Sequence, residues 1–395
     1  MPEQPIKDQT AIAGIGWTEF SRSSTTSVGN LAMQASLAAI RDAGLSVQDI
    51  DGVVTYFHEH MDTIPPRTLI TAMGMKECNF QTMADAGGSW NCSAVLTAAM
   101  AVHAGICKHV LVYRALRSYS ERDRRPRPEQ YVGGEEQFEV PYGSLSAVAN
   151  FGHLATAHMA RFGTTVLDFA HLAVTQRHHA SLNTKAQMRK PITIEDHQNS
   201  RWIAYPFRLL DCCQQSDGAV ALVVTSAERA RDLKHAPVYI MAAMGGYGDA
   251  QSLPDMWETH GAKISSHLYE GAGITPCDVS FAEIYDPFTY MCLTHIEDFG
   301  LVKKGEAGPW VTAGHNALDG AVPVNTHGGL LSEAHIHGLN HVLEAVQQLR
   351  PEGVVDDLCS GPHTYDRTTC RQVRNPGVAL VCGEGGGSAL LLRGA

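Results

Sequence analysis

The 395-residue chain is predicted to fold as an α/β protein built from two duplicated halves. Short apolar runs that end in glycine alternate with helical patterns, as expected for strands joined by helices. Residues 42–56 and 271–285 also share one pattern: a helix ending in Ala-Gly, an Asp-containing turn and an apolar strand ending in tyrosine. The offset between the two stretches is constant, which indicates an internal repeat.

The first 113 residues supply three predicted strands and two predicted helices. A strand over 11–16 precedes a helix over 28–43, and a turn and a second strand follow over 49–56. A glycine turn then leads into an alanine-rich helix that ends at residue 105, a composition typical of a helix buried between sheets. Residues 110–113 form the next predicted core strand.

The remainder of the chain continues the same alternation. Residues 117–145, rich in Arg, Pro, Glu and Gly, predict a long loop, and a helix over 162–175 and a strand over 217–225 follow. The second half opens with a strand over 238–244. It closes over 378–392 with two apolar runs around a glycine cluster, which predicts a hairpin.

We therefore divide the chain into two halves. Residues 1–235 form the first half, with an inserted loop region over about 115–210, and residues 236–395 form the second. Hydrophobic residues make up 44% and charged residues 18%, which is typical of a soluble globular protein. No apolar run approaches the ~18 residues of a membrane span, and the N-terminus lacks a signal-peptide pattern.

Charge and cysteine spacing exclude several classes of site. A net charge of −11 argues against a nucleic-acid partner. The ten cysteines include no CxxC pair and no HExxH motif appears, so no metal site is predicted. Without a secretion signal the expected compartment is a reducing cytoplasm.

The stretch Asn325-Thr-His-Gly-Gly-Leu-Leu-Ser-Glu-Ala-His-Ile-His-Gly338 carries the main functional signal. Gly328 and Gly329 allow a sharp turn whose N–H groups can approach a ligand. Residues 339–349 have the apolar spacing of a helix packed on a core. His335, between the turn and that helix, is suited to proton transfer near neutral pH. The alternative is that His335 only caps a buried helix.

Taken in order, these motifs resemble the thiolase superfamily over essentially the whole chain. The markers are the duplicated halves, the turn and helix at 87–105, Asp217-Gly-Ala, Tyr285-Asp-Pro-Phe288, Gly328-Gly…His335 and the terminal hairpin. They are most similar to the sterol-carrier-protein-X and lipid-transfer-protein-like branch. The resemblance implies a thiolase-like fold, a five-layer α-β-α-β-α sandwich, a homodimer and acyl-CoA substrates. Coenzyme A is then part of the substrate, and no bound cofactor is expected.

The resemblance places the family's catalytic positions unevenly on this chain. The nucleophilic cysteine of thiolases falls on Ser89, with Cys92 one helical turn further in. Serine without an adjacent base is a poor nucleophile, although a shift in register would make Cys92 the nucleophile. Tyr285 stands where related thiolases place the histidine of a His-Asp-Cys-Phe motif. His335 matches the histidine of the family's Gly-His-Pro motif, and Gly383 stands in place of the second cysteine.

A thiolase-like protein without its nucleophile resembles the lipid-transfer-protein-like retro-aldolases, which cleave steroid side-chain CoA thioesters. The resemblance implies that Tyr285 and His335 are an acid/base and enolate-binding pair, although those aldolases carry a second tyrosine where His335 stands. The residues expected to line the thioester site are Ser89, Asp286, Gly328, Gly329, Gly385 and Gly386. The alternatives are a thiolase or acyltransferase using Cys92, and a non-catalytic lipid-transfer-like subunit.

The resemblance also implies a partner. The related aldolases act with a small protein that carries an OB fold and a zinc ribbon, and this chain contains neither. The arginine-rich segment 117–127 is a candidate contact for the CoA phosphates or for that partner. The alternative for this segment is a solvated surface loop.

Overall fold

Strands from both halves join into one continuous sheet in the computed structural model. The structure describes residues 6–57, 63–85, 87–120, 137–138, 140–144, 146–245, 255–354 and 370–395. In spatial order the strands are β3 (Phe80–Asp85), β2 (Gly52–Phe57), β4 (His109–Arg117), β7 (Asp217–Ser226), β1 (Thr10–Trp17), β8 (Val238–Met244), β11 (Ala389–Arg393), β10 (Val378–Cys382) and β9 (Phe281–Glu283). The antiparallel pair β1–β8 joins the two halves.

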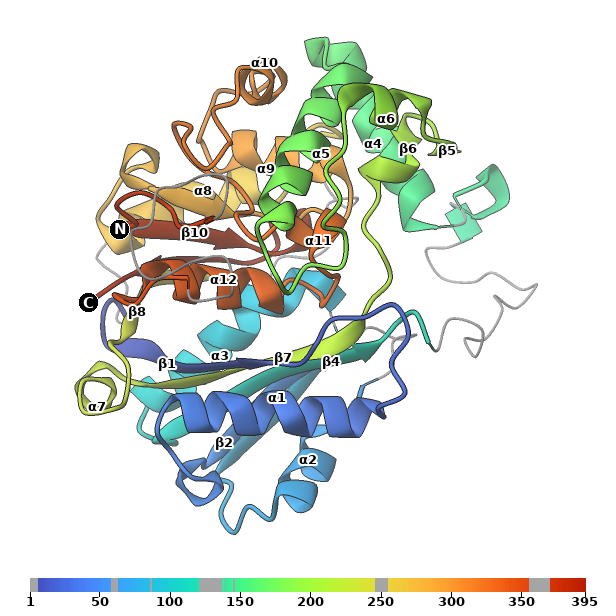
Figure 1. Cartoon of the computed structure of the whole chain (residues 1–395). Helices are drawn as coiled ribbons and strands as arrows, with labels where there is room; N and C mark the ends of the chain where they lie inside the picture. Colours follow the sequence, from blue (N-terminus) through green and yellow to red (C-terminus); the bar gives the residue numbers. More distant parts are fainter. Residues whose placement is uncertain are drawn as a thin grey trace.

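Helices cover this bent sheet in α-β-α-β-α layers (Figure 1). The outer helices of the first half are α1 (Val28–Asp42) and α2 (Pro66–Met73), and those of the second half are α8 (Gly261–Ala272) and α9 (Thr289–Asp298). Between the two parts of the sheet lie α3 (Asn91–His103), which is mostly buried but exposes Met100 and His103, and α12 (Leu339–Leu349), which is buried throughout. The predicted layered sandwich and both predicted central helices are confirmed.

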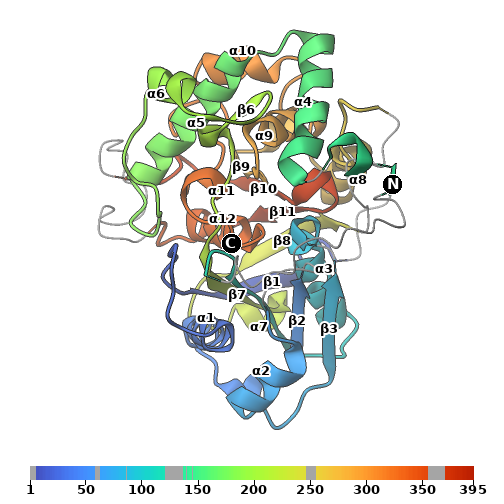
Figure 2. The same cartoon turned by 90° about the vertical axis from the view of Figure 1, so that its right-hand side faces the viewer.

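The region over about 115–210, predicted as a loop insertion in the first half, contains helices. Its elements are α4 (Ala147–Phe162), α5 (Val166–Ser181), α6 (Ile194–Asn199), β5 (Trp202–Ala204) and β6 (Phe207–Arg208). Three short helices lie elsewhere in the chain: α7 (Ala227–Ala230), α10 (Ala307–Thr312) and α11 (Gly329–Ser332). Figure 2 shows α4, α5 and α6 gathered near α9 at one end of the molecule. Most of the predicted loop over 117–145, including Arg122 to Arg127, lies outside the described residues.

The helix predicted over 162–175 was placed wrongly. The chain forms two helices there, because Gly163 adopts a left-handed conformation (φ 79°) that ends α4. Thr165 then begins α5, since its side chain accepts a hydrogen bond from the Asp168 backbone N–H. The sequence pattern ran across this break because apolar residues continue on both sides of it.

The predicted repeat is present as two copies of strand, helix, short 3-10 turn and strand. The turns are η1 (Val47–Asp49) and η8 (Pro276–Asp278). In each, the aspartate carboxylate accepts hydrogen bonds from the residue three positions earlier, Ser46 in one copy and Thr275 in the other. The copies differ at their ends: Tyr56 lies inside β2, whereas β9 stops before Tyr285. Tyr285 is therefore free of the strand ladder.

No described helix has both the length and the apolar composition needed to cross a bilayer. Within the described ranges, no three His, Cys, Asp or Glu side chains are grouped as metal ligands would be. Eight of the described cysteines are free thiols, whereas Cys370 is disulfide-bonded.

A buried ionic cluster supports α12. Glu344 is fully buried, contacts the Arg371 guanidinium, and lies 4.0 Å from Lys185 Nζ. Thr326 Oγ1 donates to the same carboxylate at 2.7 Å. Burial alone would raise the pKa of Glu344, but the positive charges of Arg371, Lys185 and His327 hold it well below its ordinary value. Glu344 is therefore ionised in the folded protein at neutral pH.

We predict that Glu344→Gln lowers the free energy of unfolding by about 3–5 kcal/mol at pH 7, because the buried Arg371 loses its charged partner. Urea denaturation measures this difference. The folded-state pKa of Glu344 lies below the ordinary 4.5. The wild-type advantage is therefore complete above about pH 4.5 and shrinks as pH falls toward the lower pKa. Glu306→Gln, at an exposed position, is the control and should change stability by less than about 0.5 kcal/mol. A pH-independent penalty, or equal effects in both variants, would contradict the assignment.

Candidate active site

Tyr285 and His335, the predicted acid/base pair, lie in contact. The Tyr285 hydroxyl is 3.1 Å from His335 Nε2 and the two rings meet edge to face. Tyr285 follows β9, and His335 lies in the segment between α11 and α12. Tyr285 is buried, whereas His335 is partly exposed. The histidine is thus the more accessible member of the pair.

The direction of this hydrogen bond follows from burial. Burial raises the pKa of Tyr285 well above its ordinary value, and the negative charge of Glu384 raises it further. The phenol therefore stays protonated near neutral pH and donates its hydrogen to His335 Nε2. This nitrogen must then be an acceptor, which leaves the imidazole able to take up a proton.

The Tyr285 ring lies between Gly88 and His341. It stacks on the His341 imidazole with ring centroids 6.2 Å apart. On the other side, a Cβ at position 88 would lie 1.9 Å from the Tyr285 hydroxyl oxygen. Gly88 belongs to the turn η2 (Gly87–Trp90), which leads directly into α3. The phenol oxygen is therefore placed near the N-terminus of a buried helix, where the helix dipole favours negative charge.

Asp286 holds the predicted glycine turn. Its Oδ1 accepts a 2.8 Å hydrogen bond from the Leu330 backbone N–H and lies 3.2 Å from His341 Nε2. A Cβ at Gly329 (φ 66°) would lie 2.0 Å from Asp286 Oδ2, so only glycine allows this approach. Asp286 is fully buried, and the geometry gives it and Gly329 a positioning role. A contact of Asp286, Gly328 or Gly329 with substrate stays a prediction.

The predicted helix register at Ser89 and Cys92 is wrong: Ser89 lies before α3, and Cys92 lies at its start. Ser89 lies in η2, where its carbonyl accepts a 2.6 Å hydrogen bond from Ser388 Oγ. The helix begins at Asn91, so Cys92 is its second residue and not one turn inside it. Cys92 is fully buried, and burial raises the pKa of its thiol well above the ordinary value. A protonated, inaccessible thiol is a poor nucleophile, which favours the interpretation of Cys92 as a small core residue.

The predicted terminal hairpin places its turn at the same location. β10 and β11 are joined by η9 (Glu384–Gly386), which packs against η2. Gly385 and Gly386 both have positive φ, and the Gly385 carbonyl accepts a hydrogen bond from the His260 backbone N–H. The hairpin prediction is confirmed. The proposed thioester contacts of Gly385 and Gly386 stay predictions.

Three polar residues near the pair received no role from the sequence. Glu384 follows Gly383, which aligns with the family's second cysteine. This proximity was the only feature of the sequence that could have pointed to Glu384. His337 lies two residues after His335, with its ring centroid 4.9 Å from that of His335. Arg114 contacts His337 from β4. Nothing in the local sequence of a buried strand marks Arg114.

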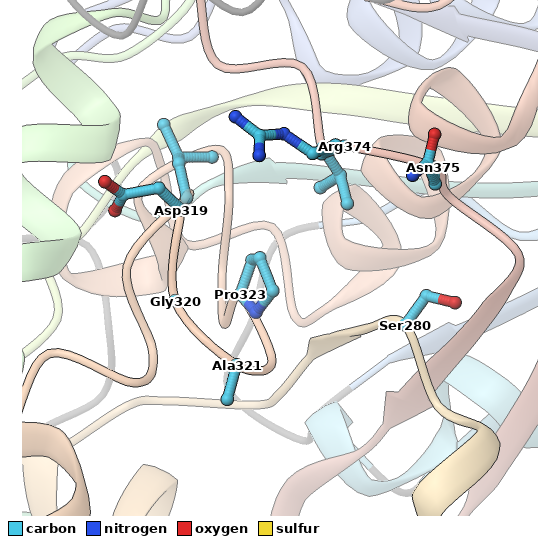
Figure 3. Close-up of a pocket in the computed structure, with 9 residues that line it drawn as sticks. Ser280, Asp319, Gly320, Ala321, Pro323, Arg374 and Asn375 are labelled. Atoms are coloured by element: carbon cyan, nitrogen blue, oxygen red, sulfur yellow. The ribbon is translucent and has the colours of Figure 1, made fainter.

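The described pockets lie elsewhere. Figure 3 shows one of about 220 Å³ lined in part by Ser280, Asp319 and Arg374. Ser280 precedes β9 whereas Tyr285 follows it, so this pocket is at the opposite end of the strand. A second pocket of about 390 Å³ includes Trp17 and Lys185 in its lining. Neither contains Tyr285 or His335, so the candidate site is defined by side-chain geometry.

Comparisons with known proteins agree with this architecture. The protein family described as thiolase C-terminal domain-like matches residues 225–358. The chain is 42% identical to the 17-hydroxy-3-oxo-4-pregnene-20-carboxyl-CoA lyase of Mycobacterium tuberculosis, covering 88% of this chain and 93% of the relative. It is 40% identical to a steroid side-chain-cleaving aldolase of Thermomonospora curvata, covering 87% and 91%. The solved Ltp2-ChsH2(DUF35) aldolase superposes with a TM-score of 0.87 at 37% identity over 99% of both chains.

We predict that Gly88→Ala displaces the Tyr285 hydroxyl and breaks its hydrogen bond to His335, because the added Cβ would overlap the phenol oxygen. The overpacking should cost about 1–3 kcal/mol of stability without preventing folding. A crystal structure of the variant measures the displacement. Gly29→Ala, where the nearest atom is 3.7 Å from the added Cβ, is the matched control and should leave the pair in place. An undisturbed Tyr285–His335 contact in Gly88→Ala would contradict the packing described here.

Proposed function

The chain belongs to the thiolase superfamily and, within it, to the family of steroid side-chain-cleaving CoA lyases, and from this we propose that it is a CoA-thioester retro-aldolase. Its substrate is a β-hydroxyacyl-CoA carrying a steroid side chain, as the names of both relatives suggest. The observation that carries the proposal is the hydrogen bond between Tyr285 and His335, beside a cysteine that is buried and protonated. Such a site supports proton transfer and not covalent acyl transfer.

The reaction requires a general base and a hydrogen-bond donor that stabilises the negative charge of the enolate. His335 takes the proton of the substrate's β-hydroxyl, and the resulting alkoxide collapses to a ketone or aldehyde as the Cα–Cβ bond breaks. The electron pair of that bond forms the enolate of the shorter acyl-CoA, and protonated His335 returns the proton to Cα, which restores the neutral imidazole. As His335 Nε2 takes up the β-hydroxyl proton, the Tyr285 hydroxyl hydrogen turns from that nitrogen to the thioester oxygen, where it stabilises the developing negative charge of the enolate. No electrons are gained or lost overall, so no redox cofactor takes part, and coenzyme A enters only as part of the substrate.

The proposed function includes a partner protein. The similar solved aldolase is a complex with a DUF35 protein, and we propose a comparable OB-fold and zinc-ribbon partner for this chain, in the cytoplasm. The partner would complete the binding of the CoA ester. Ser89, the 328–329 turn and the 385–386 turn are the proposed contacts of the thioester on this chain.

A homodimer is also part of the proposal. Among the described strands, β3 pairs with β2 on one side only and forms an edge of the sheet (Figure 2). Unpaired backbone groups of an edge strand are a template for pairing with another chain. Phe80 and Met83 on this strand are partly exposed, which suits them to contact with a second copy.

The decisive measurement is a cleavage assay with a β-hydroxyacyl-CoA that bears a steroid side chain, using this chain co-expressed with a DUF35-type partner. We expect release of a ketone or aldehyde and a shorter acyl-CoA. Tyr285→Phe should lower kcat by about 10²–10³-fold, since the hydrogen-bond donor to the developing charge is lost, while the far-UV circular dichroism spectrum is unchanged.

Cys92→Ser is the matched control in the same assay. It should retain near wild-type cleavage, because the thiol has no role in the proposed chemistry. Near-normal turnover in Tyr285→Phe would remove that residue from the mechanism. Thiolysis of a β-ketoacyl-CoA by added CoA, abolished by Cys92→Ser, would instead establish a thiolase.

We predict that light scattering of the purified chain gives twice the chain mass, and that Met83→Asp shifts it toward monomer because the proposed pairing would bring a charge from each copy into the interface. Ala313→Asp, an exposed position at the C-terminal end of α10, adds the same charge on another element and should leave the dimer intact. A monomeric wild-type chain, or equal dissociation in both variants, would rule out pairing through β3.

A further inference from the structure

A buried contact between the two halves fixes the proton position on His337. Arg114, fully buried on β4, places Nη2 3.2 Å from His337 Nδ1. A guanidinium group has only donors and stays charged in proteins. His337 Nδ1 is therefore the acceptor, its ring proton is on Nε2 and the ring is neutral. A second positive charge on His337 would face the Arg114 cation at short range in a buried site, which opposes protonation.

Tyr56 holds the backbone of the same residue. Its hydroxyl donates a 2.8 Å hydrogen bond to the His337 carbonyl, and the Arg114 guanidinium lies over its ring at 5.4 Å. Burial raises the pKa of Tyr56, so the phenol stays a donor. His337 has φ 48°, a left-handed conformation uncommon for residues other than glycine. Two strands of the first half, β2 and β4, thus hold both the backbone and the ring of His337.

His337, held by Arg114 and Tyr56, also contacts the candidate pair. The His335 and His337 ring centroids are 4.9 Å apart, and the His335 backbone N–H donates to Ser216 Oγ at 3.0 Å. His335 Nε2 in turn accepts from Tyr285. Among the described residues, the titratable groups around the two histidines are Arg114 on β4, Tyr56 on β2, Tyr285 after β9 and His341 on α12, which stacks on Tyr285, while Glu384, Cys213 and Asp286 act on Tyr285.

We propose that Arg114 is a positioning residue: it fixes His337 as the neutral Nε2–H tautomer and, through His337, holds His335 against Tyr285. The consequence for turnover rests on the proposed function, whereas the tautomer of His337 does not. Because Arg114 belongs to the first half and both histidines to the second, the geometry of the pair depends on how the halves pack.

Nitrogen-15 NMR of the full chain labelled at histidine tests the tautomer without any substrate. The His337 signals, identified by their loss in His337→Asn, should show an unprotonated Nδ1 and a protonated Nε2 throughout pH 5.5–8. In Arg114→Met, His337 Nδ1 loses its hydrogen-bond donor, and His337 should exchange tautomers or titrate within this range. Arg114→Lys retains a charged donor and serves if the methionine variant does not fold. A wild-type His337 that protonates near its ordinary pKa of about 6.5, or carries its proton on Nδ1, overturns the proposal.

Kinetics on the acyl-CoA substrate test the positioning role. Asparagine tolerates positive φ and places an amide oxygen near the position of Nδ1, whereas glutamine places its amide near that of Nε2. His337→Asn should therefore keep kcat within about 5-fold of wild type. His337→Gln and Arg114→Met should lose about 10–100-fold in kcat, the effect of a misplaced catalytic group, with KM changed by less than about 3-fold.

The two readouts separate the two ideas. Equal kcat values in His337→Asn and His337→Gln would overturn the positioning role even if the tautomer is as stated. Correct NMR signals with no cleavage of any acyl-CoA by the wild type would count against the proposed function and leave the tautomer assignment standing.

Discussion

The close approach of the Tyr285 phenol to Gly88 is the constraint on which the candidate site depends. A side chain at position 88 would occupy the place of the phenol oxygen. Because Gly88 has no side chain, three segments can lie close together: η2 before α3, the turn η9 and the segment after β9. Since these three segments come from distant parts of the sequence, one missing Cβ determines whether they can meet.

The internal repeat places two tyrosines at matching positions near the site, and the differences between the two copies give these tyrosines different roles. Tyr56 and Tyr285 occupy matching positions in the repeat, and both hydrogen-bond to the short segment 335–337, one to a backbone carbonyl and the other to an imidazole. The tyrosine inside β2 supports the backbone, whereas the tyrosine released from β9 reaches His335. The first half thus contributes support through Tyr56 and Arg114, and the second half contributes the acid/base pair.

Burial decides which side chains can react. Cys92 lies near the N-terminus of a helix, where a thiolate would ordinarily be stabilised, yet its complete burial keeps the thiol protonated. The same burial keeps Tyr285 a donor and leaves the partly exposed His335 as the member of the pair that can accept a proton. Glu344 on α12, the helix that follows residues 335–337, forms ion pairs with Arg371 and Lys185 that hold this helix in place. Charge is buried there only because it is paired.

The sequence by itself determined the α/β class, the repeat, the central helices and the candidacy of His335, because periodicity, capping residues and glycine turns are local signals. The candidacy of Tyr285 came from the resemblance of its motif to the thiolase superfamily. The sequence pattern missed the break between α4 and α5, since the apolar pattern continues across Gly163, and it left open whether Ser89 or Cys92 occupies the nucleophile position. Only the tertiary structure decided the 3.1 Å contact of Tyr285 with His335, the burial of Cys92 and the role of Arg114. These depend on contacts between residues up to hundreds of positions apart, and no local pattern encodes which distant side chains will share a low-dielectric core.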